Sequence, residues 1–256
     1  MIVAICVFSL FHPVEFELQP ARGSVLVVNQ EQVLEGSAKA KLRSRAIVTG
    51  RDGAEAAFIL SIPGKIRREF HGTLDVREKD GHLLAIVMMT LENAVASIVA
   101  AESPPGAPIE ALKAQAVVTR SFLMAAHGRH QGFDFCDTTH CQFLREAPPR
   151  GNINATAAAD TKDLIVAYQG RAIAALYSAN CGGTTRTLED AGWNADPYPY
   201  FGVKCPVRGE VSGHRIGMCQ EGAAQMARHG KTFREILALY FPATTISADT
   251  DVRAGW

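Results

Sequence analysis

The first third of the chain alternates short apolar runs with turn residues. The apolar runs cover residues 2–11, 24–28, 46–48, 56–62, 72–76 and 82–89, and several are rich in valine and isoleucine. Such β-branched residues favour strands, and Asp52-Gly53 and Asp80-Gly81 are typical of turns between strands. The pattern predicts a β-rich N-terminal region over residues 1–89.

From residue 91 the apolar positions recur at helical spacing. Residues 91–101 are predicted to form a helix that ends before Pro104 and Pro105, because proline lacks an amide donor and restricts the residue before it. A second helix is expected from Pro108 to about Gly128, a residue suited to helix termination. Glu102 is therefore expected at a helix end.

Two basic residues of the second helix share one of its faces. Lys113 and Arg120 are seven residues apart, which is two helical turns. The pattern predicts a carboxylate, Glu102, at a bend that faces these two ordered cations.

The rest of the chain mixes helices and strands. We expect a helix at 155–163, strands at 164–168 and 172–177 joined across Gln169-Gly170, and helices at 220–229 and 233–240. The sequence therefore predicts an α+β fold. Its parts are a β-rich region (1–89), a mixed α/β domain (90–246) that carries the chemistry, and a C-terminal tail (247–256).

Composition narrows the classes of function. Of 256 residues 47% are hydrophobic and 20% are charged, which is typical of a globular protein. Lysine plus arginine equals aspartate plus glutamate at 26 each, so no net field favours nucleic acid as a partner. The apolar start lacks the basic residues and cleavage site of a clear signal peptide, and we interpret it as a first strand.

Five motifs occur in a fixed order along residues 91–242. They lie at residues 99–104 (VAAESP), 111–122 (ALKAQAVVTRSF), 135–142 (FCDTTHCQ), 178–183 (SANCGG) and 213–220 (GHRIGMCQ), the last followed by Gly222-Ala223. In this order they resemble the SpoIID/LytB family of bacterial cell-wall proteins. The mixed domain is thus expected to be a SpoIID-like catalytic domain.

The resemblance implies a peptidoglycan lytic transglycosylase that acts on glycan strands in the cell envelope, periplasmic or extracellular. It assigns the role of catalytic acid to Glu102 and carries the family's basic pair over to Lys113 and Arg120. Further candidates for binding the sugar are Gln115, Tyr177, His214 and Gln220. Without the resemblance, Glu102 is interpreted as a solvated carboxylate at a helix end.

Two other functions remain open. Some members of the wider family stimulate a cell-wall amidase without cutting glycan, so a glycan-binding amidase enhancer is the alternative. The third hypothesis is a zinc or thiol protein without a role in the cell wall.

The resemblance also implies a structural zinc held by His130, Cys136 and Cys141. Their donor types and spacing suit a tetrahedral site, whose fourth position is left for His140, water or a substrate atom. The alternative is a disulfide between Cys136 and Cys141 with surface histidines.

Several residues depart from the family pattern or allow two interpretations. Arg215 stands where glycine is usual, and a side chain there would oppose a backbone conformation that glycine permits. Cys181 and Cys205 flank a long loop and are either a disulfide or buried thiols. Cys219, next to a helix start, is interpreted as a small packed residue.

Overall fold

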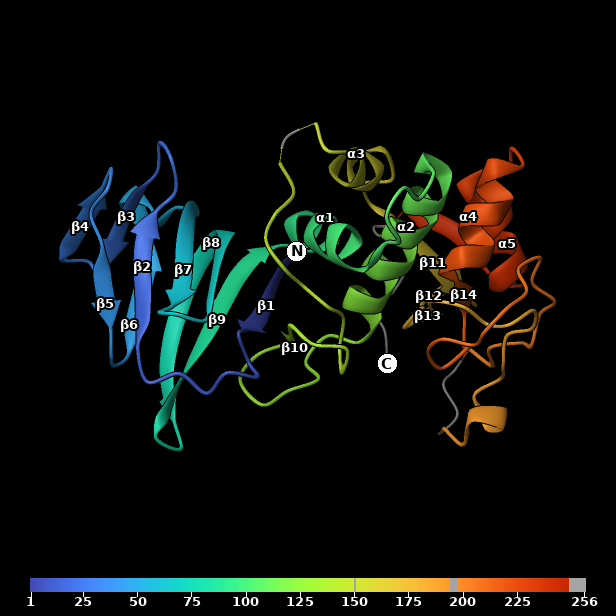
Figure 1. The fold of residues 1–256 in the computed structure, drawn as a ribbon, viewed down its shortest axis with the longest axis horizontal. Helices are drawn as coiled ribbons and strands as arrows, with labels where there is room; N and C mark the ends of the chain where they lie inside the picture. The colour runs from blue at the N-terminus through green and yellow to red at the C-terminus, as the bar shows by residue number, and fades with distance from the viewer. Residues whose placement is uncertain (150, 194–197, 249–256) are drawn as a thin grey trace. The chain divides into compact units, whose positions relative to one another are not determined.

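The structure is a computed structural model that describes residues 1–149, 151–193 and 198–248 (Figure 1). The chain forms two compact units, Met1–Ala101 with His127–Pro148, and Glu102–Ala126 with Pro149–Trp256. Helices and strands are both abundant and the N-terminal part is rich in strands, which confirms the α+β prediction.

The first unit contains ten strands, one short helix and most of one longer helix. The strands are β1 (Ile2–Val7), β2 (Phe16–Pro20), β3 (Val25–Val28), β4 (Gln32–Glu35), β5 (Ala40–Leu42), β6 (Ala46–Thr49), β7 (Ala56–Ile62), β8 (Ile66–Lys79), β9 (His82–Thr90) and β10 (Phe135–Cys136), with the short helix η1 (Arg51–Gly53) before β7 and α1 (Leu91–Glu102) after β9. The apolar runs of the sequence all contain strands. β2, β4 and β5 were not predicted, because each has few apolar residues and these stand next to polar or charged ones.

These strands form one ten-stranded sheet, in which β10, β1, β9, β8, β6, β3 and β4 follow one another, while β7, β2 and β5 extend from β8. β8 pairs with β7 up to Gly72 and with β9 from Thr73 onward. Gly72 has a φ of +147°, and a Cβ there would collide with the Met88 carbonyl oxygen. Only glycine fits where β8 changes partner.

The core of this unit is aromatic. Phe8, Phe58 and Phe70 are each 1% exposed, and the ring centroid of Phe70 lies 5.7 Å from that of Phe8 and 6.0 Å from that of Phe58. Phe16 joins the cluster with no exposed surface. Because Phe8 follows β1 directly, this core fixes the end of the strand on which β10 is paired.

The described residues of the second unit form four helices of two or more turns and three small strand pairings. Its elements are α2 (Ile109–Ala125), α3 (Ile153–Asp160), β11 (Leu164–Tyr168), β12 (Arg171–Ala172), β13 (Tyr177–Ser178), η2 (Glu189–Ala191), β14 (Met218–Cys219), α4 (Gln220–Arg228), α5 (Phe233–Tyr240) and β15 (Thr245–Ala248). β12, β11 and β15 form one sheet, and β13 pairs with β14 in parallel.

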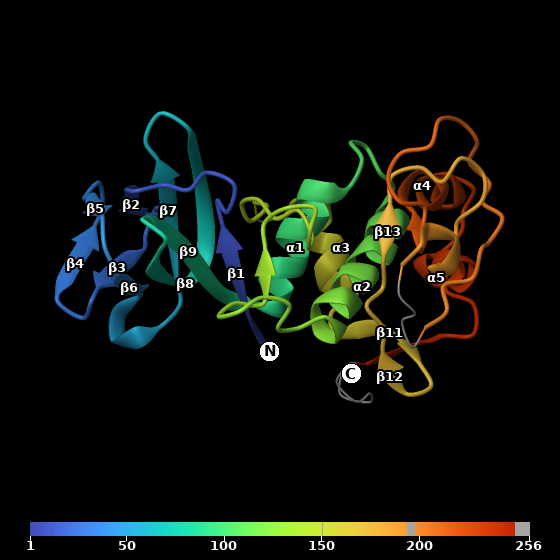
Figure 2. The same cartoon turned by 90° about the horizontal axis from the view of Figure 1, so that it is seen from below.

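Helix α2 is the centre of the second unit, as Figures 1 and 2 show. Nearly every residue from Ala111 to Leu123 is buried, so the helix is covered on all sides. Its residues Val117 and Val118 belong to one apolar core with Val166 of β11 and Ile236 of α5. The site residues near the start of α2 therefore stand on a rigid support.

The predicted strand at 172–177 is divided in the structure. The hairpin turn across Gln169-Gly170 is confirmed, with φ values of +50° and +73°. β12 ends at Ala172, whereas Tyr177 pairs with Met218 in a separate ladder. The chain leaves the first ladder because Tyr177 finds its partner 41 residues further on, which no local pattern reveals.

The end of the described chain is a strand. Residues 247 and 248, expected in the tail, belong to β15, which pairs with β11, and residues 249–256 lie outside the described residues.

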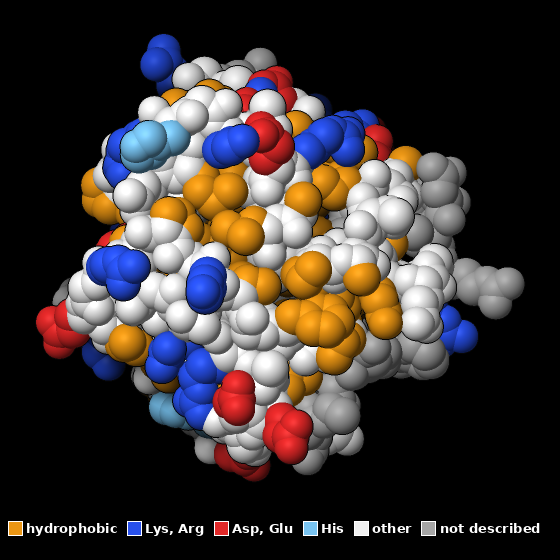
Figure 3. Space-filling model, turned by 90° about the vertical axis from the view of Figure 1, so that its right-hand side faces the viewer, with side chains coloured by type: hydrophobic (Ala, Val, Ile, Leu, Met, Phe, Trp, Pro, Cys, Tyr) orange, Lys and Arg blue, Asp and Glu red, His pale blue; other side chains and the backbone are white. Residues whose placement is uncertain are grey.

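Among the described residues, no helix combines the length and the apolar character needed to cross a bilayer. Figure 3 shows hydrophobic side chains gathered on the face of the second unit, with charged side chains around them.

Candidate active site and metal centre

Glu102 is the last residue of α1 and is half-buried. The chain then turns, with the Ala107 amide donating to the Pro104 carbonyl at 3.1 Å, and α2 begins after Pro108. The Gln220 side-chain amide donates to the main-chain carbonyl of Glu102 at 2.9 Å. The start of α4 thus fixes the bend that carries the candidate acid.

Gln220, Gln115 and Tyr177 converge beside Glu102. The Gln220 Nε2 atom lies 3.4 Å from the Gln115 Oε1 atom. The Tyr177 hydroxyl is buried among the side chains of Glu102, Thr119 and Gln115, but none of them meets it at the distance and angle of a hydrogen bond. Burial, followed by the negative charge of Glu102, raises the pKa of Tyr177 well above its ordinary value. The phenol therefore keeps its proton and can donate it in a hydrogen bond.

A small pocket adjoins this cluster. Ser103, Gln115, Met218 and Gln220 contribute to its wall, and its volume is about 10 Å³. The Ser103 hydroxyl is buried without a hydrogen-bonding partner among the described residues. The pocket has room for roughly one water molecule and none for a sugar ring, so a glycan would have to reach Glu102 from its exposed side.

His214 lies next to Tyr177. Its Nδ1 atom accepts a hydrogen bond from the Ile216 amide at 3.0 Å. Burial lowers the pKa of His214, and a hydrogen bond with the main chain of Tyr177 opposes this shift in part. The lowered pKa and the hydrogen bond that Nδ1 accepts are both consistent with a neutral imidazole, and the backbone holds its ring.

Arg215 adopts the left-handed backbone conformation, with a φ of +68°. Glycine is the residue best suited to that region, so the expectation that a side chain would oppose the local conformation is confirmed. The Arg215 side chain compensates in part, since its Nη2 atom donates to the Thr184 carbonyl at 2.8 Å.

The two cations of α2 bind other groups of the second unit. The Lys113 ammonium lies 3.2 Å from Glu110 and 3.2 Å from Asp160, and the hydrogen bond to Asp160 is the main cause of its raised pKa. Arg120 is fully buried and donates to the carbonyls of Ala158 at 3.2 Å and Leu164 at 3.0 Å. These contacts tie α2 to α3 and β11, and a role of either cation in sugar binding stays a prediction.

The segment after α2 returns to the first unit and forms a loop around β10. Two carboxylates attach it to the first strand: Asp134 accepts from the Ala4 amide at 2.7 Å, and Asp137 accepts from the Phe8 amide at 2.9 Å. Asp137 also lies 3.5 Å from the guanidinium of Arg68. Cys136, at the end of β10, is thereby held in a buried position.

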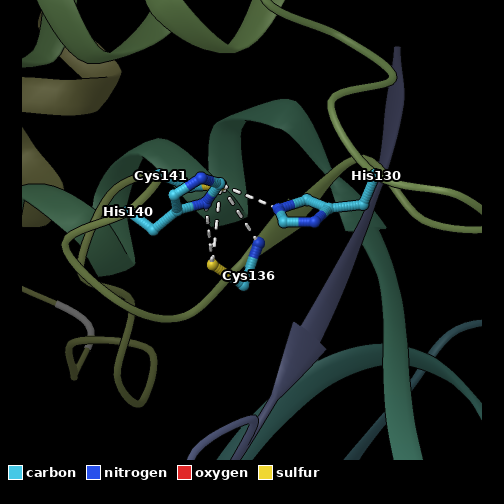
Figure 4. Close-up of side chains that lie close together, drawn as sticks. All are labelled: His130, Cys136, His140 and Cys141. Carbon is cyan, nitrogen blue, oxygen red and sulfur yellow. Dashed lines mark hydrogen bonds between the residues drawn. The ribbon is translucent and has the colours of Figure 1, made fainter.

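Four side chains of this loop converge (Figure 4). The donor atoms of His130, Cys136, His140 and Cys141 all lie within 4.8 Å of one another. The Cys141 Sγ atom is 3.2 Å from His130 Nε2, 3.6 Å from Cys136 Sγ and 3.6 Å from His140 Nδ1. The predicted set is brought together, and His140 supplies the position that the sequence left open.

The donor set fits a tetrahedral zinc ion. With bonds of about 2.3 Å to sulfur and about 2.0 Å to nitrogen, ligand atoms at the corners of a tetrahedron lie roughly 3.3–3.8 Å apart. The contacts of Cys141 match this spacing. Burial, followed by the charges of His140 and Arg129, lowers the pKa of His130 and so favours the neutral ring that binds metals. Cys136 and Cys141 are free thiols in the structure.

Comparison with known proteins identifies part of the chain. Residues 79–168 match the model of the family described as SpoIID: Stage II sporulation protein. This segment is a SpoIID domain. The resemblance to SpoIID is thus confirmed over residues 79–168, and the segment belongs to a family related to sporulation and the cell wall.

The chain also has a relative in Brachyspira hyodysenteriae. An uncharacterized protein of Brachyspira hyodysenteriae is 32% identical over 147 residues, which cover 56% of this chain. The matched region spans 37% of the length of that relative. Its name gives no activity, so the comparison supports the likeness in sequence alone.

The candidate residues lie both inside and outside the SpoIID match. Glu102, Gln115 and the loop with the candidate metal ligands fall within residues 79–168, whereas Tyr177, His214 and Gln220 follow it. Thr119, a neighbour of the Tyr177 hydroxyl, and Ser103 were not predicted as site residues. The one available signal was helical spacing, because Thr119 lies one turn after Gln115 on α2.

Proposed function

We propose that this protein cleaves peptidoglycan glycan strands in the cell envelope as a lytic transglycosylase, with Glu102 as its general acid and base. The observation that carries the proposal is the position of Glu102: half-buried at a fixed helix end, next to a protonated buried phenol. The SpoIID match, whose family is related to the cell wall, supports this substrate class.

One carboxyl group can serve both steps of this reaction. Glu102, protonated, donates its proton to the bridging oxygen as the bond from that oxygen to the anomeric carbon of N-acetylmuramic acid breaks. The resulting carboxylate then takes the proton of the 6-hydroxyl, whose oxygen attacks the anomeric carbon and closes a 1,6-anhydro ring. Between the steps, the Tyr177 hydroxyl, which lies beside Glu102, would donate a hydrogen bond to the ionised carboxylate.

The other candidates are proposed to bind the substrate. The Gln115 and Gln220 amides offer donors for sugar hydroxyl and acetamido groups, and His214 offers a neutral ring next to Tyr177. For Lys113 and Arg120, the proposed contact with the glycan would be made in addition to the carboxylates and carbonyls that they already bind.

Zinc is proposed as a structural ion held by His130, Cys136, His140 and Cys141. Bound there, it would supply four strong bonds that close the loop, while the proton chemistry belongs to Glu102. The fit of the donor atoms to a tetrahedron supports this assignment.

The test is glycan cleavage by the full chain. We expect purified glycan strands without stem peptides to yield 1,6-anhydromuramoyl ends, detected by mass spectrometry. Glu102→Gln keeps the shape of the side chain and removes its acid function, and we expect it to lower the rate by about 100-fold or more. Glu189→Gln, at an exposed glutamate, is the matched control and should keep the wild-type rate.

Two results would contradict the proposal. One is equal product from wild type and Glu102→Gln. The other is a folded, zinc-loaded wild type that yields no anhydro ends but accelerates a cell-wall amidase, which would favour the amidase enhancer. Metal-dependent activity lost in Cys136→Ser and unchanged in Glu102→Gln would favour a zinc or thiol protein.

A further inference from the structure

Three cysteines far apart in the sequence meet in the core of the second unit. The Sγ atoms of Cys181, Cys205 and Cys219 lie within 4.8 Å of one another. Cys181 and Cys219 have no exposed surface, and Cys205 is partly buried. All three are free thiols, so none of the three possible pairs is joined as a disulfide in the structure.

The backbone is arranged to hold these thiols together. The parallel pairing of Ser178 with Cys219 places β14 beside the chain that leads to Cys181. The Cys205 amide donates to the Gly183 carbonyl at 2.9 Å, which brings the long loop back to the same turn. The cluster thus unites the two motifs around residues 181 and 219 with the loop between them.

Hydrogen-bond donors surround the sulfur atoms. The Cys219 Sγ atom accepts from the amides of Cys181 at 3.3 Å and Gly222 at 3.4 Å, and the Tyr240 hydroxyl lies 3.0 Å from Cys205 Sγ. Cys219 is also the N-cap residue of α4, where the helix dipole favours negative charge. Amide donors to sulfur and a helix N-terminus are what a bound thiolate requires.

Residue 222 lies so close to the cluster that it has no room for a side chain. A Cβ at this position would collide with the Tyr240 hydroxyl and with Cys205 Sγ. The first turn of α4 can therefore approach the thiols only because residue 222 is glycine.

We propose that Cys181, Cys205 and Cys219 form a second metal site, which binds one thiophilic d¹⁰ ion, Zn²⁺ or Cu⁺, through three thiolates. Soft thiolate ligands select these ions, and their bonds of about 2.3 Å set the sulfur atoms roughly 3.8 Å apart. Each sulfur atom needs to move by about 1 Å or less to reach that spacing. As each metal–sulfur bond forms, the thiol releases its proton to solvent.

The experiment uses the full chain, purified under reducing conditions, stripped of metal and titrated separately with Zn²⁺ and with Cu⁺. The double variant Cys136→Ser/Cys141→Ser removes the site of the first unit. We expect this variant to bind one equivalent of one of the two ions, and the further change Cys219→Ser to reduce this to zero. Cys6→Ser, at another buried free thiol, should leave the equivalent in place.

Wild type provides a readout that does not depend on the variants folding. We expect wild type to bind one equivalent of metal at the three cysteines, in addition to any ion bound at the site of the first unit. A wild type that binds no ion beyond that number would overturn the proposal. So would a Cys181–Cys205 disulfide, found by alkylation and mass spectrometry in protein purified without reductant.

Discussion

At the residue scale, the candidate site is marked by polar atoms that the fold buries without giving them partners. The hydroxyl groups of Ser103, Tyr177 and Ser178 are such atoms among the described residues. A buried hydroxyl without a hydrogen bond costs about 1–3 kcal/mol. Asp75 Oδ1 and Gln142 Oε1 of the first unit are also buried without a partner, so the three hydroxyls alone do not define the site. A bound ligand that supplies the missing partner would offset this cost, which makes the three hydroxyls candidates for contacts with the substrate.

Tyr177→Phe tests this interpretation by separating stability from activity. The change removes a buried hydroxyl that has no partner at hydrogen-bonding geometry, so we expect the melting temperature to stay the same or rise. Glycan cleavage should fall by roughly 10-fold, because the carboxylate of Glu102 loses its donor. Calorimetry and the anhydro-end assay measure the two effects. A melting temperature that falls together with activity would indicate a structural hydroxyl instead.

His214 should make stability depend on pH. Its folded-state pKa lies below the unfolded value of about 6.5, so the unfolded chain binds the proton more readily. The stability that the neutral ring contributes is present above about pH 6.5 and is lost as the pH falls through and below that value. We expect the melting temperature of wild type to approach that of His214→Asn between pH 7.5 and pH 5.

Exposed His12 supplies the control, because His12→Asn should follow wild type across the same pH range. If wild type and His214→Asn keep a constant difference in melting temperature, the imidazole of His214 does not titrate in this range.

At the scale of elements, the loop that carries the proposed zinc ligands is held by short contacts within its own sequence and by pairing with strand β1. Thr138 Oγ1 lies 3.2 Å from Cys136 Sγ and accepts from the His140 amide at 3.2 Å. One hydroxyl therefore orients two of the proposed zinc ligands, Cys136 and His140. Groups that hydrogen-bond to metal ligands orient those ligands and so affect the affinity for the metal.

Thr138→Val should weaken zinc at the site of the first unit by about 10–100-fold, because the hydroxyl that orients Cys136 is lost while the volume is kept. Competition with a chromophoric chelator measures this affinity, and the site is identified as the one that Cys136→Ser removes. Thr244→Val changes a hydroxyl of the second unit that bonds to the Phe241 carbonyl and should have no effect. Equal affinities for Thr138→Val and wild type would remove Thr138 from the site.

At the scale of the whole molecule, each compact unit is built from separate stretches of sequence. Residues 127–148 belong to the same unit as the N-terminal strands, because Phe135 and Cys136 pair with Ile5 and Cys6 of β1. A fragment that begins after β9 would keep all four metal donors and lose the strand that supports them. Its metal site thus depends on residues more than 120 positions away, such as Ala4 and Phe8.

We therefore predict that residues 90–256, produced without residues 1–89, bind zinc at the His130 site much more weakly than the full chain. The physical reason is the loss of the Ala4 and Phe8 amides, which hold the carboxylates of Asp134 and Asp137. In the full chain, Asp134→Ala with Asp137→Ala should weaken zinc in the same direction. Zinc bound by the fragment with the affinity of the full chain would contradict this dependence.

The sequence by itself determined the elements whose signals are local. Apolar runs with turns between them gave most strands of the first unit, helical spacing with Pro104 and Pro108 gave the two helices around Glu102, and the order of the motifs gave the SpoIID resemblance. The set of His130, Cys136 and Cys141 was also accessible, because its members lie within twelve residues.

Only the tertiary structure decided which distant residues meet. It placed Gln220 on the carbonyl of Glu102, occupied Lys113 with Asp160, and gathered Cys181, Cys205 and Cys219 from three segments. Helical spacing specifies the face on which a side chain lies, but its partners depend on how helices and strands pack. Packing is settled by burial summed over the whole chain, which no local stretch of sequence contains.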